Sequence, residues 1–281
     1  MQEIKKINDR IYYVTHEEET DRPVIGIIVG DNKVLIVDAG NSAKHSEMVL
    51  DFMKSNNIPY PDYCILTHWH WDHVFGADNL KSILVAHEKT TEKLEEMKGY
   101  SWDDDSLAER VRTGEEIEFG AEHIKVEFED RNEIKIRIPD ISFSEKMVFD
   151  LGGVTCEVIH VAGDHSPDST VVYIPQEKIV FLGDCLYENL YSNPERYTYD
   201  NVFKLVDKLL AIDADIFIEA HTSLKKRKEE LEVLFMLKEL AEKSRKFDNP
   251  SEFIEYLKEE KIYDLNEDIE ELATLFTRYK Q

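Results

Sequence analysis

The chain has 281 residues, of which 42% are hydrophobic, and its 59 acidic residues outnumber its 34 basic ones to give a formal net charge of −25. This length fits one large domain or two modest ones, with enough apolar residues to bury a substantial core. A surface this acidic repels phosphate backbones, so we expect no nucleic acid as substrate or partner.

Two further features concern where the protein works. The N-terminal stretch MQEIKKINDR is charged and lacks an apolar core of signal-peptide length, and no later run is long enough to span a bilayer. Three cysteines, Cys64, Cys156 and Cys185, are too few for a disulfide framework and fit a reducing compartment. We therefore expect a cytoplasmic protein with no membrane association.

The first part of the chain predicts strands joined by turns. Segments rich in β-branched and aromatic residues predict strands at 10–14, 24–30 and 33–40. Apolar residues at helical spacing predict a helix over 43–54. The apolar run YCIL at 63–66 predicts a buried strand that leads directly into the sequence THWHWDH.

Strands and helices continue to alternate after this motif. Strands are predicted at 82–87, 154–161, 179–183 and 215–221, and helices at 89–98, after Asp105 and Ser106, and at 201–211. Apolar residues at every second position from 115 to 138 predict an antiparallel meander with one wet face. Beyond Leu224 the apolar stripes are helical.

The stretch THWHWDH, at 67–73, holds three of the ten histidines and an aspartate. In an extended segment residues two apart point the same way, so His68 and His70 are predicted to share one ion, with Asp72 on their side. His73 then points away, toward a second ion. Imidazole with carboxylate suits zinc, and less selectively iron or manganese. An exposed histidine-rich turn without a ligand is the less favoured interpretation.

Three more residues of ligand type follow apolar, strand-like runs: His165, Asp184 and His221. Because strand ends collect at one edge of a sheet, these positions predict a site assembled from distant parts of the chain. The isolated histidines His16, His45, His87 and His123 are expected to be surface or core residues. Trp69 and Trp71 are expected to pack, with a pocket wall as the less favoured role, and Cys185 is expected to be a packed thiol rather than a ligand.

The motifs THWHWDH, GDHSPDS and FLGD, followed by a strand-end histidine, resemble the metallo-β-lactamase fold superfamily of metal-dependent hydrolases over roughly Ile11 to Thr222. The resemblance implies a four-layer αββα sandwich with two divalent metal ions at one edge of the sheets. It implies that His68, His70 and His165 hold one ion, that Asp72, His73 and His221 hold the other, and that Asp184 bridges them. Asp38, in IVDAG, is given a supporting role.

The sequence departs from the family pattern around the third histidine. Where the family commonly has Pro-Gly-His, this chain has Ala162-Gly163-Asp164-His165, so His160 competes with His165 as the ligand. We prefer His165 because HSPDS matches the turn that follows in the family. The predicted organisation is a catalytic domain at 1–223, with an insertion at about 99–140, and a helical extension at 224–281.

The predicted activity is hydrolysis of a small ester, thioester or lactone by a hydroxide that bridges two metal ions, with zinc expected and iron or manganese as alternatives. Asp72 is expected to orient the hydroxide and pass its proton to the leaving group. Tyr187 has the offset from Asp184 seen in the lactone-hydrolysing branch, where a phenol donates to the substrate oxygen. Packing on the loop is an equal alternative for Tyr187.

Three alternatives remain open from the sequence. They are a mononuclear iron enzyme similar to the persulfide dioxygenases, a phosphodiesterase of the same fold, and a metal-dependent binding protein without turnover. The expected partner is a small-molecule substrate. The segments 99–140 and 224–281 are expected to cover the pocket, to form a homodimer contact or merely to extend the core.

Overall fold

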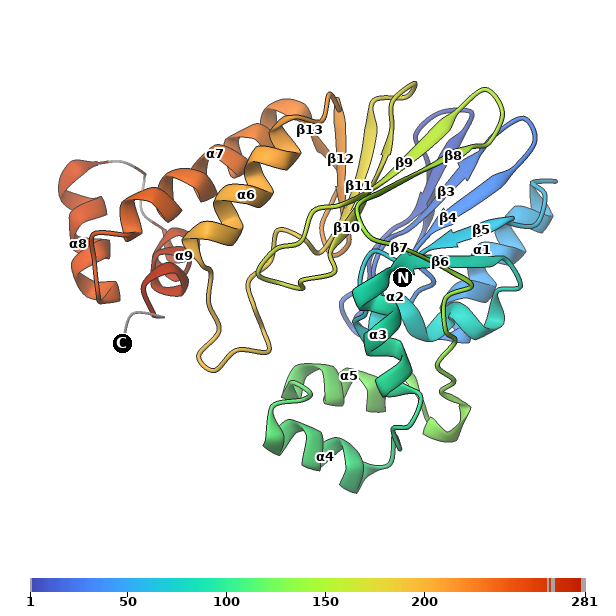
Figure 1. Cartoon of the computed structure of the whole chain (residues 1–281), viewed down its shortest axis with the longest axis horizontal. Coiled ribbons are helices and arrows are strands. Elements are labelled where there is room, and N and C mark those ends of the chain that lie inside the picture. The colour runs from blue at the N-terminus through green and yellow to red at the C-terminus, as the bar shows by residue number, and fades with distance from the viewer. Residues whose placement is uncertain (1, 262, 264–265, 279–281) are drawn as a thin grey trace.

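The computed structural model describes residues 2–261, 263 and 266–278, so the remainder of the predicted 224–281 extension lies outside the described part. Two β-sheets stand face to face, and helices cover the outer face of each (Figure 1). This is the four-layer αββα sandwich that the motifs predicted.

The first sheet has seven strands in the order β1-β2-β3-β4-β5-β6-β7. Its strands are β1 Ile4–Lys6, β2 Ile11–Val14, β3 Ile25–Val29, β4 Val34–Val37, β5 Tyr63–Ile65, β6 Ile83–His87 and β7 Ile141–Phe143. The first four strands pair antiparallel, and β4 to β7 pair parallel. Parallel neighbours need crossover connections, which the helices between them supply.

The second sheet has six strands in the order β13-β12-β11-β10-β9-β8. Its strands are β8 Lys146–Asp150, β9 Thr155–His160, β10 Thr170–Ile174, β11 Ile179–Gly183, β12 Ile216–Glu219 and β13 Lys225–Lys226. Only β11 and β12 pair parallel, through the crossover helix α6. The strand β10 was not predicted from the sequence.

Helices connect these strands and follow them. The α-helices are α1 Ala43–Ser55, α2 Trp71–Val74, α3 Glu88–Met97, α4 Asp104–Thr113, α5 Glu118–Glu127, α6 Tyr199–Leu210, α7 Arg227–Ser244, α8 Pro250–Glu260 and α9 Glu267–Thr277. Short 3-10 helices follow α2 at Phe75–Asn79 and α5 at Arg131–Glu133. In Figure 1 α6 to α9 lie on one side of the sandwich, and α4 and α5 form its lower edge.

Central strands of the sandwich, such as β4, are buried on both faces. In β4, Val34 and Ile36 pack into the cluster beneath α1, while Leu35 and Val37 pack between the two sheets. Burial on both faces explains why this strand is a continuous apolar run rather than an alternating one.

The meander predicted over 115–138 is wrong, because this segment contains α5. Ile124 and Phe128 are buried on one side of this segment, whereas Phe119 and Val126 leave exposed fractions of 52% and 58%. The helical period therefore decides which side chains are buried, and the two-residue alternation was a coincidence.

Two smaller differences concern where elements begin. The helix predicted after Asp105 and Ser106 begins at Asp104, because the Asp103 side chain accepts a hydrogen bond from the Ser106 amide and caps it. Beyond Leu224 a two-residue strand, β13, pairs with β12 before α7 begins. None of the helices in the described part of the chain has the length and apolarity to cross a bilayer.

Glu230, on α7, is a fully buried carboxyl group. Lys225 Nζ lies 3.8 Å from one of its oxygens, but this ammonium also bonds to Glu219. Burial and the charge of Glu219 raise the pKa of Glu230 to about 7, although Lys225 opposes the shift.

Replacing this carboxyl should make stability less dependent on pH. The unfolded chain releases the proton near the ordinary pKa of 4.5, whereas the folded chain keeps it to about pH 7, so the free energy of unfolding falls as pH rises through this interval. Glu230→Gln should stabilise the fold by on the order of 2 kcal/mol above pH 7 and change little below the ordinary pKa. Thermal unfolding measured once above pH 7 and once below the ordinary pKa of 4.5 tests this, with the exposed Glu232→Gln as control. Equal shifts at both pH values would contradict it.

Candidate metal centre

The motif THWHWDH changes its backbone conformation midway. His70 is extended, and α2 begins at the next residue. Successive residues of a helix turn by about 100°. The prediction from extended parity, that Asp72 shares the side of His68 and His70, is therefore wrong: Asp72 and His73, in the first turn of α2, face a second group together.

The structure brings together all seven residues proposed as ligands, in two groups. The first contains His68, His70 and His165, and the second contains Asp72, His73, Asp184 and His221. Within each group the candidate ligand atoms lie within 4.8 Å of one another. All of them are buried except His221, whose side chain is partly exposed.

Asp184 lies between the two groups. Its Oδ2 is 3.7 Å from His68 Nε2 and 3.5 Å from His165 Nε2, on the side of the first group. The same oxygen is 3.2 Å from His73 Nε2 and 3.4 Å from His221 Nε2, on the side of the second. One carboxylate therefore contacts both groups, in the place that the resemblance implied for a bridging ligand.

The segment around the third histidine places His165 in the centre and His160 outside it. His160 donates from Nε2 to the Pro167 carbonyl oxygen and stacks on His87, with ring centroids 3.8 Å apart. The additional residue, Asp164, accepts hydrogen bonds from the backbone amide and hydroxyl of Thr198 at the start of α6. The departure from the family pattern therefore serves the helix and not the metal centre.

Carboxylates behind the second group orient its imidazoles. His73 Nδ1 donates to Asp38 Oδ2 at 2.8 Å, which directs His73 Nε2 toward Asp184. Asp38 is held in turn by the amide and hydroxyl of Thr67. On the opposite side Asp21 lies 3.5 Å from His221 Nδ1. A carboxylate behind a histidine fixes its tautomer and orientation for metal binding.

Close packing of the two sheets underlies this arrangement. Gly183, at the end of β11, has φ +56, and a Cβ built on it would lie 2.7 Å from Thr67 Oγ1. Only glycine allows this approach without displacing Thr67, which holds Asp38.

The two groups differ in their protonation. Burial and the neighbouring histidines lower the pKa of His68, His70 and His165, which keeps these imidazoles neutral and able to bind a metal. Burial opposes the charged form of His73 and His221, but the surrounding carboxylates outweigh it and raise the pKa of both. Cation binding at the second group would therefore replace protons.

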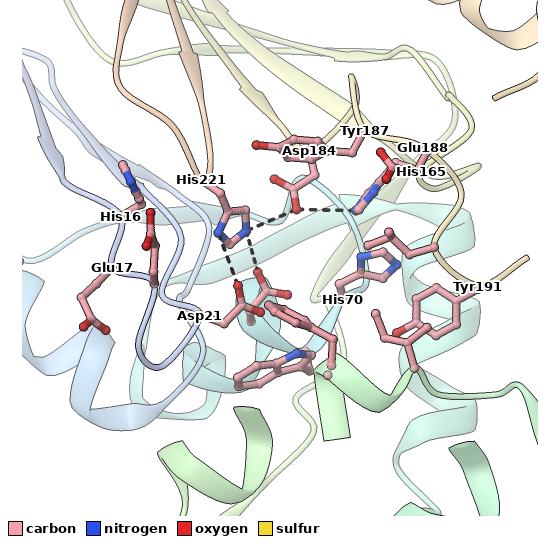
Figure 2. Close-up of a pocket in the computed structure, with 17 residues that line it drawn as sticks. His16, Glu17, Asp21, His70, His165, Asp184, Tyr187, Glu188, Tyr191 and His221 are labelled. Carbon is pink, nitrogen blue, oxygen red and sulfur yellow. Dashed lines mark hydrogen bonds and ion pairs between the residues drawn. The ribbon is translucent and has the colours of Figure 1, made fainter. Parts of the chain in front are cut away.

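A cavity of about 490 Å³ opens over the second group and also reaches His70 and His165 (Figure 2). One wall comes from the segment 99–140, through Ile117, Phe119 and Gly120. The sequence had left the role of this segment open, and the structure shows that it covers the pocket.

Other parts of the lining were not predicted from the sequence. The turn between β2 and β3 contributes His16, Glu17, Glu18 and Asp21, so the isolated His16 is a surface residue that faces the cavity. Trp71 lines the cavity, the less favoured of its two expected roles, whereas the Trp69 ring packs against His70 and Tyr191. The Tyr191 hydroxyl donates to Glu116 at 2.9 Å and so joins the loop before α6 to the segment before α5.

Tyr187 lines the cavity above the metal residues. The Tyr187 ring centroid lies 5.9 Å from that of His165 and 6.4 Å from that of His221. Burial and the charge of Asp184 raise the pKa of the Tyr187 phenol, so it remains a hydrogen-bond donor at neutral pH. None of the described residues hydrogen-bonds to its hydroxyl. The phenol is therefore available to a substrate.

A four-layer αββα sandwich with histidines and aspartates gathered at the ends of its strands defines a class of metal-dependent hydrolases. The chain belongs to the metallo-beta-lactamase superfamily, whose family model matches residues 21–224, and this confirms the resemblance predicted from the motifs.

Solved structures share this fold at low sequence identity. A metallo-beta-lactamase from Pontibacter korlensis is 20% identical with a TM-score of 0.60, and the match covers 84% of this chain and 99% of that one. The DIM-1 metallo-beta-lactamase is 19% identical with a TM-score of 0.60, over 86% of this chain and 97% of that one. A double mutant of the sec-alkyl sulfatase PisA1 is 13% identical with a TM-score of 0.67, over 99% of this chain and 50% of that one.

Proposed function

We propose that this protein hydrolyses small esters, thioesters or lactones with two divalent metal ions, zinc being the expected metal. The observation that carries the proposal is the position of Asp184 Oδ2 between two groups of imidazole and carboxylate ligands. A site for a single ion needs only one such group, so the second group favours two ions over the mononuclear iron alternative.

The polar atoms of the centre fit bound cations. Asp184 Oδ1 and His70 Nε2 are buried, and neither has a hydrogen-bond partner among the described residues. Unpartnered buried polar atoms are costly unless a ligand satisfies them. Imidazole with carboxylate suits zinc first and iron or manganese second.

Asp72 and Tyr187 have different roles in the proposed hydrolysis. Two bound divalent cations would make water nucleophilic near neutral pH and polarise the scissile carbonyl. Asp72 faces the cavity, where its carboxylate orients the attacking water and carries the proton to the leaving group. Tyr187 donates a hydrogen bond to the oxygen on which negative charge develops. The α5 segment limits the access of bulk water to this side of the cavity.

Metal analysis combined with a substrate panel tests the proposal. Metal-free protein reloaded with zinc, iron(II) or manganese should bind two ions per chain and hydrolyse at least one of an ester, a thioester and a lactone. The panel includes a phosphodiester, and a persulfide with oxygen consumption as the readout. One ion per chain with persulfide-dependent oxygen consumption, or turnover of the phosphodiester alone, would overturn it.

Tyr187→Phe should separate a catalytic phenol from a packing residue. Losing a donor to the developing oxyanion costs on the order of 100-fold in kcat, with little change in KM. Metal content and melting temperature should stay the same, because the Tyr187 hydroxyl makes no hydrogen bond to a described residue. The control is Tyr173→Phe, which removes a hydroxyl that donates to the Asp213 carbonyl, away from the cavity. If kcat for a confirmed substrate is unchanged, Tyr187 has no catalytic role and only packs in the loop.

A further inference from the structure

We propose that the cavity selects substrates that carry no negative charge. The apolar part of such a substrate would pack against Ile117 and Phe119, at the start of α5 (the α5 segment). Its far end, uncharged or ammonium, would lie toward Glu17, Glu18 and Glu188. The inference rests on the proposed hydrolase function for its kinetic test, but its binding test does not need turnover.

The wall contributed by the α5 segment and the loop before α6 is apolar. Ile117, Phe119 and Leu190 line it together with the ring of Tyr191. The Tyr191 hydroxyl is already bonded to Glu116, so this residue presents its ring to the cavity. A wall of this kind gains free energy by covering alkyl or aryl groups of a ligand.

Acidic side chains also line the cavity, together with histidines and the rings of Trp71 and Tyr187. Besides Asp72 and Asp184, the acidic ones are Glu17, Glu18, Asp21 and Glu188. Glu17 and Asp21 lie on one side of the His221–Asp184 pair and Glu188 on the other (Figure 2). An anionic tail therefore meets acidic groups on both sides of the metal centre, although burial raises the pKa of Glu188 and raises that of Asp21 to about 7.

No lysine or arginine is among the described residues that line the cavity. Two arginines on neighbouring segments are engaged elsewhere. Arg22 pairs with Glu127 at 2.7 Å, and the Arg110 guanidinium packs over the rings of Tyr100 and Trp102. Arginine and lysine are the side chains that most often bind carboxylate, phosphate or sulfate groups, and the described lining of this cavity presents neither.

The charge of bound metal ions does not reverse this preference. Two bound divalent ions would act on the reacting carbonyl, and Asp72 and Asp184 would offset part of their charge. The proposed tail would reach Glu17 or Glu188, on either side of the His221–Asp184 pair. Hydrogen bonds from the Thr20 hydroxyl and amide outweigh the effect of burial and lower the pKa of Glu17, so its carboxylate stays charged at neutral pH.

A matched series of para-nitrophenyl esters tests the proposal kinetically. The esters share one acyl chain and end in a methyl, a trimethylammonium or a carboxylate group. With metal-loaded protein, kcat/KM for the ester whose acyl chain ends in methyl should exceed that for the ester whose chain ends in carboxylate by roughly tenfold or more. The ester whose chain ends in trimethylammonium should have a kcat/KM equal to or above that of the methyl-terminated one. Equal turnover of the methyl and carboxylate esters would overturn the proposal.

Variants locate the selectivity in the cavity. The triple substitution Glu17→Gln, Glu18→Gln and Glu188→Gln should raise the ratio of carboxylate to methyl turnover by about tenfold. The control, Glu19→Gln, Glu92→Gln and Glu95→Gln, changes the net charge equally at exposed residues outside the lining and should leave this ratio unchanged. If the control shifts the ratio as much, the selectivity comes from the overall charge and the proposal is wrong.

Inhibitor binding separates this proposal from the hydrolase proposal. Hydroxamates with the same three tails bind metal centres without turnover, and calorimetry gives their dissociation constants with the zinc-loaded protein. The carboxylate hydroxamate should bind roughly tenfold or more weakly than the methyl one. If this order holds but no ester, thioester or lactone is hydrolysed, the hydrolase proposal fails and charge selection stands. If the two bind equally, charge selection fails whatever the protein hydrolyses.

Discussion

Asp184→Asn is expected to abolish hydrolysis and to reduce bound metal from two ions per chain to one or fewer. Asp184 Oδ2 contacts imidazoles of both groups, so in the proposed two-ion centre its charge would support both ions at once. Losing an outer partner of a metal ligand typically costs 10–100-fold in affinity or activity. Removing a ligand that both ions share should therefore lower kcat by more than about 100-fold. Elemental analysis and turnover of the same preparation measure both effects.

The matched control is Asp164→Asn. Asp164 is also a buried carboxylate, one residue before His165, but it bonds Thr198 and Asn201 at the start of α6. Its substitution should lower the melting temperature while leaving two ions bound. If Asp184→Asn retains both ions and ordinary activity, or if Asp164→Asn loses metal equally, then Asp184 does not bridge the two groups.

The residues of the metal centre could be predicted from the sequence because each follows a short apolar strand. His165 follows β9, Asp184 follows β11 and His221 follows β12, and the strand ends of one sheet are neighbours in space. The strand ends alone predict that these residues gather, whereas the division into two groups and the choice of His165 over His160 followed from the family resemblance.

The walls of the pocket could not be predicted in this way. Ile117 and Phe119 belong to the segment 115–138, whose alternating apolar residues resemble those of a strand, although the burial of Ile124 and Phe128 follows a helix. The turn bearing Glu17 and Asp21 has no apolar pattern, and it reaches the centre only because β2 and β3 form a hairpin beside it. Side chains placed by tertiary packing leave no periodic signal.

The structure also decides between two predictions for Asp72. The resemblance implied that Asp72 joins His73 in the second group, whereas alternation along a strand placed it beside His68 and His70; α2, which begins at Trp71, brings Asp72 and His73 to the second group together. This matters for mechanism, since a helical turn brings Asp72 to the cavity and leaves His73 buried behind it.

Asp72→Asn should lower kcat by about 10²–10⁴-fold, the range for removing a general acid–base group. Asp72 Oδ2 lies 3.0 Å from His73 Nε2 and 3.2 Å from His221 Nε2. The asparagine side chain is therefore also expected to weaken the binding of an ion by the second group. A ligand role and a proton-transfer role thus both predict a loss, and measuring kcat alone does not separate them.

The leaving group separates the two roles of Asp72. An ester of para-nitrophenol releases a stable phenolate that needs no proton, whereas an ester of an alkyl alcohol must be protonated as it leaves. If Asp72 carries the proton, Asp72→Asn should reduce hydrolysis of the alkyl ester by at least about tenfold more than that of the nitrophenyl ester. Weaker metal binding, assayed at saturating zinc, lowers both equally. An equal defect with both esters would therefore assign Asp72 to metal binding alone and leave proton transfer to another group that faces the cavity.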